Sequence, residues 1–245
     1  MVWGNLLGLQ LWIVVPVTVL GGLMRGFAGF GSGMLMAPIL SVFYGPVNTV
    51  AIIVLLEAMA TIQLIPQIRY HVTWSLVAPL ALIAMIVMPL GGWLLVSLTP
   101  VLMTRTISLV ALACVALIAS GWKYSGRRSH IATVVVGMLS GIMMGATSLG
   151  MPPVMAYLFS GNDAVSNSRR NITAYFALIL SGMLAILMMK GLLQKDALAL
   201  VILLTPLYIA TTWIGNVLFQ KFTEVGYRRI VLGLLMFSGL YGLLR

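Results

Sequence analysis

Apolar runs of about 20 residues recur from one end of this sequence to the other, and each is long enough to cross a bilayer core of about 30 Å as a helix. Hydrophobic residues make up 61% of the chain and charged residues 7%, whereas a soluble domain has about a quarter charged residues. Backbone in lipid must satisfy its own hydrogen bonds, and no stretch alternates with the period of a barrel strand. The sequence therefore predicts an all-α polytopic membrane protein.

Ten apolar segments lie along the chain, five on each side of the polar stretch KYSGRRSH. We expect helical segments near 5–24, 28–44, 47–68, 74–97, 101–121, 131–146, 148–160, 165–189, 197–219 and 227–244. The polar stretch is the one marked change in composition. We therefore predict a first membrane repeat over residues 1–122, a cytoplasmic linker over 123–130 and a second membrane repeat over 131–245. We expect eight to ten helical segments in total, and the number that cross the membrane fully stays open.

The two halves share an internal pattern. Gly26 to Pro38 in the first half has the same spacing as Gly141 to Pro153 in the second. Each stretch is rich in glycine, ends at proline and is followed by a short apolar run that leads to another glycine. Duplication explains this shared order better than chance does.

The loop cations indicate how the repeats are oriented. If the first two segments of each half form a broken, re-entrant hairpin or two short crossings, nine cations fall on one side, namely Arg69, Lys123, Arg127, Arg128, Arg169, Arg170, Lys221, Arg228 and Arg229. Four fall on the other, namely Arg105, Lys190, Lys195 and Arg245. A continuous first helix would instead divide them almost evenly. The positive-inside bias favours the first arrangement, with inverted repeats and both termini outside. Although the net charge is +10, most of the cations lie in short loops and form no basic face, which argues against nucleic-acid binding.

Two stretches place helix-breaking residues inside apolar segments, Met24–Pro38 and Ala146–Pro153. Glycine relaxes the backbone and proline removes an amide donor, so a continuous helix is not expected there. Irregular backbone at membrane depth is tolerated in a protein interior or beside water, and the N-termini of half-helices favour an anion. The candidate anion-binding residues in these stretches are Gly29, Gly31, Ser32, Gly33, Thr147, Ser148, Gly150, Pro152 and Pro153.

Three further glycines have a structural interpretation. Gly137, Gly141 and Gly145 follow one another at i, i+4 and i+8. This spacing puts them on one helix face, where small residues let two membrane helices pack closely. We predict packing rather than binding for these three.

Four charged residues have two interpretations each. Arg25 lies inside the first apolar region, where it either binds an anion or pairs with Glu57, the one acidic residue within an apolar span. Glu57 is either a proton-carrying carboxylate that couples transport or the partner of Arg25, and the partner role is favoured. Arg169 and Arg170 are either cytoplasmic topology signals or, in one case, a residue that attracts anions.

The same stretches resemble a known family. GFAGFGSGMLMAPIL in the first half, TSLGMPPVMAYLFSG and SRRNITAYF in the second, and the closing GNVLFQKFTEVGYRRIVLGLL resemble the TauE/SafE sulfite-exporter family over nearly the whole chain. Two departures concern the substrate: Ser32 replaces a glycine in the usual glycine run, and Met151 separates Gly150 from the paired prolines. The resemblance implies a secondary transporter in a bacterial-type inner membrane. It implies outward transport of sulfite, sulfonates or sulfoacetate-like anions.

Two alternatives to a carrier are a channel and an intramembrane enzyme. A channel or facilitator cannot be distinguished from a carrier by sequence. An intramembrane hydrolase would need a base near Ser32, yet His71 and His130 fall in loops, and HExxH and paired cysteines are absent from the sequence. No P-loop motif occurs either. We expect a protein that is not an enzyme, with no cofactor and no metal, whose partners are a small anion and the lipid bilayer. Monomer and homodimer both stay open.

Overall fold

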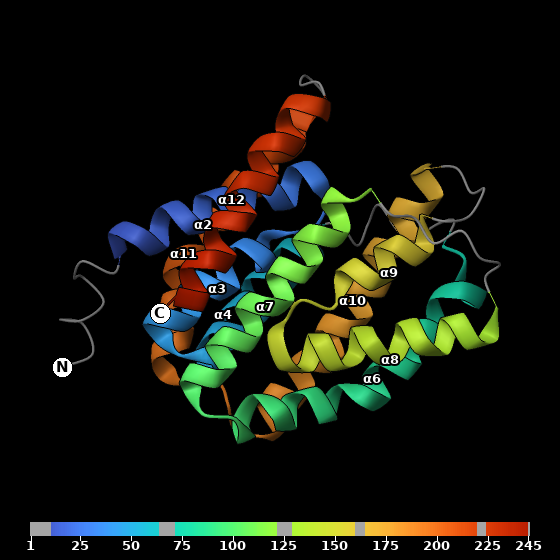
Figure 1. Cartoon of the computed structure of the whole chain (residues 1–245), viewed down its shortest axis with the longest axis horizontal. Coiled ribbons are helices and arrows are strands. Elements are labelled where there is room, and N and C mark those ends of the chain that lie inside the picture. Colours follow the sequence, from blue (N-terminus) through green and yellow to red (C-terminus); the bar gives the residue numbers. More distant parts are fainter. Residues whose placement is uncertain (1–10, 64–71, 122–128, 160–164, 220–223, 245) are drawn as a thin grey trace.

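The computed structural model describes residues 11–63, 72–121, 129–159, 165–219 and 224–244, and within these ranges every regular element is a helix (Figure 1). The helices are α2 (Leu11–Ala28), α3 (Ser32–Tyr44), α4 (Pro46–Ile62), α6 (Trp74–Ser97), α7 (Pro100–Ala119), α8 (His130–Thr147), α9 (Met151–Leu158), α10 (Val165–Met189), α11 (Lys195–Phe219) and α12 (Glu224–Leu244). Each of the ten predicted segments corresponds to one of these helices, so the predicted all-α class is confirmed.

Five of the described helices, α6, α7, α8, α10 and α11, are long and apolar enough to cross a membrane. By contrast, α3 has 13 residues and α9 has 8. At about 1.5 Å per residue, these two are too short to cross a core of about 30 Å. Short helices therefore follow both predicted breaks. The division into inverted repeats stays a prediction, and most of the predicted linker 123–130 lies outside the described residues.

The break between α2 and α3 depends on glycine. Gly29 has φ 79° and Gly31 has φ 96°, a left-handed conformation that side chains with a Cβ rarely adopt. In the second half, Ser148 takes this role with φ 60° directly after α8. Each break turns the chain sharply before the next short helix begins.

Glycines also bring long helices into backbone contact. A Cβ at Gly141 would lie 2.3 Å from the carbonyl oxygen of Ala84, and one at Gly145 would lie 2.2 Å from that of Met88. A Cβ at Gly137 would likewise be close to α6, at 3.0 Å from Ile83 Cβ. This confirms the predicted packing face of α8, which meets α6 there.

Helices α2 and α11 also come into close backbone contact at glycines. A Cβ at Gly26 would lie 1.9 Å from the carbonyl oxygen of Thr212, and one at Gly215 would lie 2.3 Å from that of Leu23. Helices of the first half thus pack on helices of the second: α2 on α11, and α6 on α8. Because helices of the two halves pack on one another in this way, the two broken segments meet inside the molecule.

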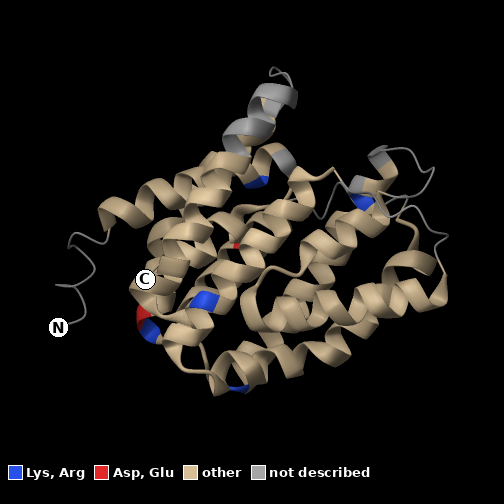
Figure 2. Ribbon diagram, viewed as in Figure 1, with Lys and Arg blue, Asp and Glu red and all other residues tan. Residues whose placement is uncertain are grey.

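The buried core and the lipid-facing surface follow from this packing. In α4, every residue from Val50 to Leu56 is buried, as expected for a central helix that is apolar all round. Large apolar side chains such as Trp93 and Trp213 are exposed on the outside, as suits a lipid environment. Figure 2 shows that the Lys and Arg of the described residues lie mainly near helix ends, which leaves long uncharged stretches between them.

Candidate functional site

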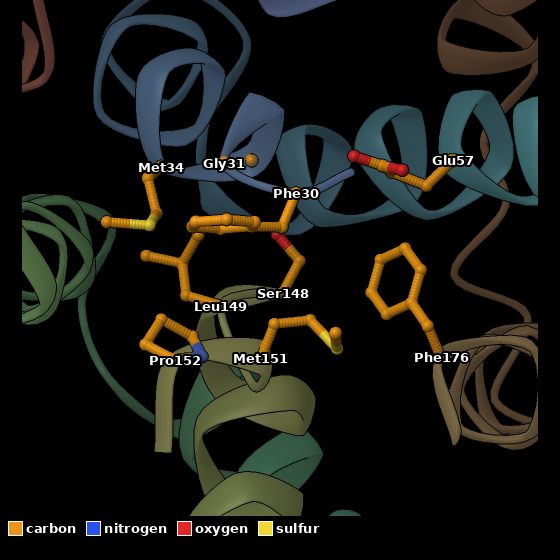
Figure 3. A pocket seen from close by; sticks show the side chains of 10 residues that line it. Phe30, Gly31, Met34, Glu57, Ser148, Leu149, Met151, Pro152 and Phe176 are labelled. Atoms are coloured by element: carbon orange, nitrogen blue, oxygen red, sulfur yellow. The ribbon is translucent and has the colours of Figure 1, made fainter. Parts of the chain in front are cut away.

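A small cavity lies where the two broken segments meet (Figure 3). Its volume is about 20 Å³, which is room for about one water molecule. The lining residues are Phe30, Gly31, Gly33 and Met34 of the first broken segment, Ser148, Leu149, Met151 and Pro152 of the second, Glu57 of α4 and Phe176 of α10. A Cβ at Gly33 would lie 3.2 Å from Leu149 Cδ2, so the two segments are in direct contact.

The first residues of both short helices border this cavity. Helix α3 begins at Ser32 and α9 begins at Met151. The first N–H groups of a helix have no partner within it, and the helix dipole makes this end positive. The contribution of α9 is the smaller one, because Pro152 and Pro153 have no N–H. The cavity is therefore a site where partial positive charge accumulates from two directions.

Arg25 lies in the last turn of α2 and is 3% exposed. Its Nε lies 2.9 Å from Oε2 of Glu57, although the angles are not those of a hydrogen bond. Its Nη2 donates to Thr61 Oγ1 at 3.0 Å, and its Nη1 donates to the carbonyl of Gly29. The guanidinium carbon lies 4.5 Å from the ring centre of Phe176. A buried cation needs such partners, and Glu57 is the charged one among them.

Glu57 connects the ion pair with the cavity. Its Oε1 accepts a hydrogen bond from the Ser32 hydroxyl at the start of α3. Of the described residues, Glu57 lines the cavity, whereas Arg25 does not. A molecule that enters the cavity therefore meets the carboxylate before it meets the guanidinium.

Tyr208 of α11 completes the polar cluster, and the sequence analysis missed it. The side chain is wholly buried, and it interacts electrostatically with Glu57 and Arg25. Its hydroxyl is close to Ser32 and to Glu57, yet it makes no hydrogen bond of ordinary geometry within the described residues. A tyrosine in an apolar span gives no sequence signal for this role.

The polar side chains of the second broken segment bond to their own backbone. Thr147 Oγ1 donates to the carbonyl of Met143 at 2.7 Å, and Ser148 Oγ donates to the carbonyl of Thr147 at 2.5 Å. These bonds stabilise the sharp turn at the end of α8. The hydroxyls are thus already occupied in this arrangement.

The family model of the sulfite exporter TauE/SafE matches residues 14–242. The chain belongs to the TauE/SafE sulfite exporter family. No curated protein and no solved structure matches the chain. Family membership and the apolar helices make it a multi-pass membrane protein, and the family is one of transporters of sulfur anions.

Some of the predicted anion-binding residues of this TauE/SafE protein are brought together. Gly31, Gly33, Ser148 and Pro152 line the cavity, and Ser32 reaches it through Glu57. Between the two interpretations of Arg25, the structure shows the pair with Glu57. That pairing is compatible with a role in anion binding, because the paired carboxylate is the one that lines the cavity.

Other predicted residues lie apart from the cavity. Thr147 and Pro153 are not among its lining residues, and Gly150 is held by a hydrogen bond from the Ser140 hydroxyl to its carbonyl. Arg170 donates to Asn167 Oδ1 at 3.2 Å on the same helix. The side chain of Arg169 lies outside the described part of the structure.

Phe176 was also missed, although it stands within the stretch SRRNITAYF that carries the family resemblance. It lines the cavity and presents its ring to Arg25. An aromatic ring over a guanidinium stabilises the cation without neutralising it. The stretch that carries the family resemblance therefore contains the sequence signal for Phe176.

Proposed function

We propose that this TauE/SafE protein is a secondary carrier that exports a small sulfur-containing anion, such as sulfite, a sulfonate or a sulfoacetate-like compound. The observation that carries the proposal is the convergence of the first residues of α3 and α9 on one cavity backed by the Arg25–Glu57 pair. Backbone N–H groups and helix dipoles at both sides favour an anion there. Arg25 supplies the full positive charge.

The binding residues follow from this arrangement. Gly31 and Gly33 let the anion approach the α3 backbone, and Ser32 and Ser148 offer hydroxyls once their present partners are exchanged. The other candidates, Gly29, Thr147, Gly150, Pro152 and Pro153, shape the two breaks around this site. One of Arg169 and Arg170 attracts anions towards the cytoplasmic entrance. There it affects the association rate of the anion more than the affinity of the site.

The size of the cavity supports a carrier that alternates between states. A sulfonate group has four heavy atoms, whereas the cavity of about 20 Å³ has room for about one water molecule. The two broken segments therefore have to separate before the anion can enter. Inverted halves over residues 1–122 and 131–245, joined by a cytoplasmic linker over 123–130, provide that movement by rocking against each other. We further propose a bacterial-type inner membrane and both termini outside, in line with the loop cations.

A carrier role also accounts for the direction of transport. An inside-negative potential favours the exit of one negative charge by about 2.3 kcal/mol per 100 mV. The potential can therefore drive, without ATP, the export of an anion that crosses with net negative charge. Membership in a transporter family supports a role that is not enzymatic.

The test is efflux from proteoliposomes that contain the purified protein. The vesicles are loaded with sulfite, thiosulfate, sulfate, sulfoacetate or a carboxylate, and efflux is followed with and without an imposed potential. We expect at least one sulfur oxyanion to leave faster than the carboxylate, and the double variant Arg25→Gln/Glu57→Gln to lose this efflux. Arg105→Gln is the matched control, because Arg105 is an exposed arginine on α7. The proposal is wrong if folded wild-type protein moves none of these anions.

A further inference from the structure

We propose that Glu57 is a tethered carboxylate that occupies the anion position on Arg25 in the empty carrier. The substrate anion takes this position when Glu57 takes up a proton. The inference rests on the proposed anion transport and deepens it, because it names the ion that is coupled. Between the two interpretations of Glu57 left open by the sequence, it favours the proton-carrying carboxylate.

The position of Glu57 relative to the cavity is the first argument. Glu57 extends from α4 into the cavity lining, as Figure 3 shows, and its Oε2 lies 2.9 Å from Nε of Arg25. Arg25 itself is screened from the cavity. An anion that enters between the broken segments can therefore reach the guanidinium by replacing the carboxylate.

The charge balance around Arg25 is the second argument. Its other partners are the Gly29 carbonyl, the Thr61 hydroxyl and the face of Phe176, all of which are uncharged. Glu57 alone among the partners that the structure describes neutralises the guanidinium. Two anions against one cation in a buried site repel each other, and a released carboxylate without a partner is strongly unfavourable there. A proton on Glu57 removes both penalties, since the substrate then neutralises Arg25 in its place.

The surroundings of Glu57 are the third argument. Two titratable side chains face it in the described structure: Arg25 from α2 and Tyr208 from α11. The contributions of α3 and α10, Ser32 and Phe176, do not titrate. The Tyr208 hydroxyl is wholly buried and has no hydrogen bond of ordinary geometry within the described residues. A protonated carboxyl both donates and accepts, so it can use this hydroxyl after it leaves Arg25.

The consequence is that one proton moves with each anion. A monovalent sulfonate then crosses without net charge. A divalent anion crosses with one net negative charge, so an inside-negative potential still drives its export. In a carrier without the carboxylate, each anion would carry one more negative charge than in the wild type.

The experiment counts protons and charge in proteoliposomes. Methanesulfonate is the monovalent probe and sulfoacetate the divalent one, with a trapped pH dye and a potential set by potassium and valinomycin. We expect one proton per anion in the wild type, with methanesulfonate flux independent of potential and sulfoacetate flux dependent on it. Glu57→Gln should move methanesulfonate without protons and in proportion to the potential. Ser238→Ala, which removes a buried hydroxyl bonded to the Leu35 carbonyl, should keep the wild-type proton count.

The outcomes separate the two proposals. Wild-type transport of either anion without proton movement would overturn the role of Glu57 and leave the anion carrier in place. Absence of transport of both anions would overturn the carrier, and the inference with it. Wild-type anion transport without protons would overturn the role of Glu57 even if Glu57→Gln fails to fold.

Discussion

Arg25 of α2 and Glu57 of α4 form an ion pair whose side chains are 2% and 5% exposed. These residues are far apart in the sequence and are joined at the rim of a cavity between two broken membrane segments. A buried pair of this kind adds little stability compared with apolar residues, whereas the loss of one partner is severe. The pair lies at a cavity in a member of a transporter family. We therefore infer that it serves transport rather than stability.

The first prediction concerns the coupling within this pair. Arg25→Met should lower the free energy of unfolding in detergent by about 3–5 kcal/mol, because it leaves the Glu57 carboxylate buried without a cation. The double variant Arg25→Met/Glu57→Gln leaves no charge behind and should lose less than the single variant. Denaturant or thermal unfolding of both variants measures the difference. A double variant that loses as much stability as Arg25→Met, or more, would contradict a coupled pair.

The second prediction concerns helix packing and uses neighbouring glycines of α6. A Cβ at Gly91 would lie 2.2 Å from the carbonyl oxygen of Ile142, whereas one at Gly92 would meet Ile186 at an ordinary 3.6 Å. Gly91→Ala should therefore force α6 and α8 apart and lower the melting temperature. Gly92→Ala should be neutral or stabilising by up to about 1 kcal/mol, because alanine favours the helix. Equal effects of the two substitutions would show that the helices are not in close contact there.

The third prediction concerns the contact between the broken segments. Gly33→Leu puts a side chain against Ser148 and Leu149, where even a Cβ is close to its neighbours. We expect anion efflux to fall at least about tenfold, since a barrier increase of about 1.4 kcal/mol suffices for that, while the helical content stays unchanged by circular dichroism. Gly233→Leu is the control, because nothing lies within 4 Å of a Cβ at that position. Unchanged efflux in Gly33→Leu would exclude the cavity as the binding site.

The fourth prediction concerns Tyr208. Tyr208→Phe removes the buried hydroxyl beside Glu57, so the pH at which transport is half-maximal should change. The loss of one hydrogen bond of about 1 kcal/mol corresponds to a shift of somewhat less than one pH unit. Stability should not fall, because no hydrogen bond of ordinary geometry to this hydroxyl is present in the described structure.

Tyr175→Phe is the matched control for Tyr208→Phe. It removes a hydroxyl that lies 2.6 Å from Ser140 Oγ. This substitution should lower stability by about 1 kcal/mol and leave the pH profile unchanged. A pH shift of the same size in both variants would mean that the effect of Tyr208 is not specific to Glu57.

The sequence by itself determined the helices and their breaks. Apolar runs of membrane-spanning length predicted the ten helical segments, and glycine and proline in GFGSG and ATSLGMPP marked where α2 and α8 end. The spacing of Gly137, Gly141 and Gly145 also predicted a packing face. These features depend on residues that are close in the chain, so local conformation and periodicity are enough to predict them.

The tertiary structure decided which polar groups meet. It paired Arg25 with Glu57, brought Tyr208 and Phe176 to that pair, and left Arg170 bonded to Asn167 on its own helix. The rotation of each helix about its axis selects these contacts, and that rotation is set by packing between distant segments. In a chain that is apolar on nearly every helix face, hydrophobic periodicity carries little information on rotation, so the sequence could name the candidate residues but not their neighbours.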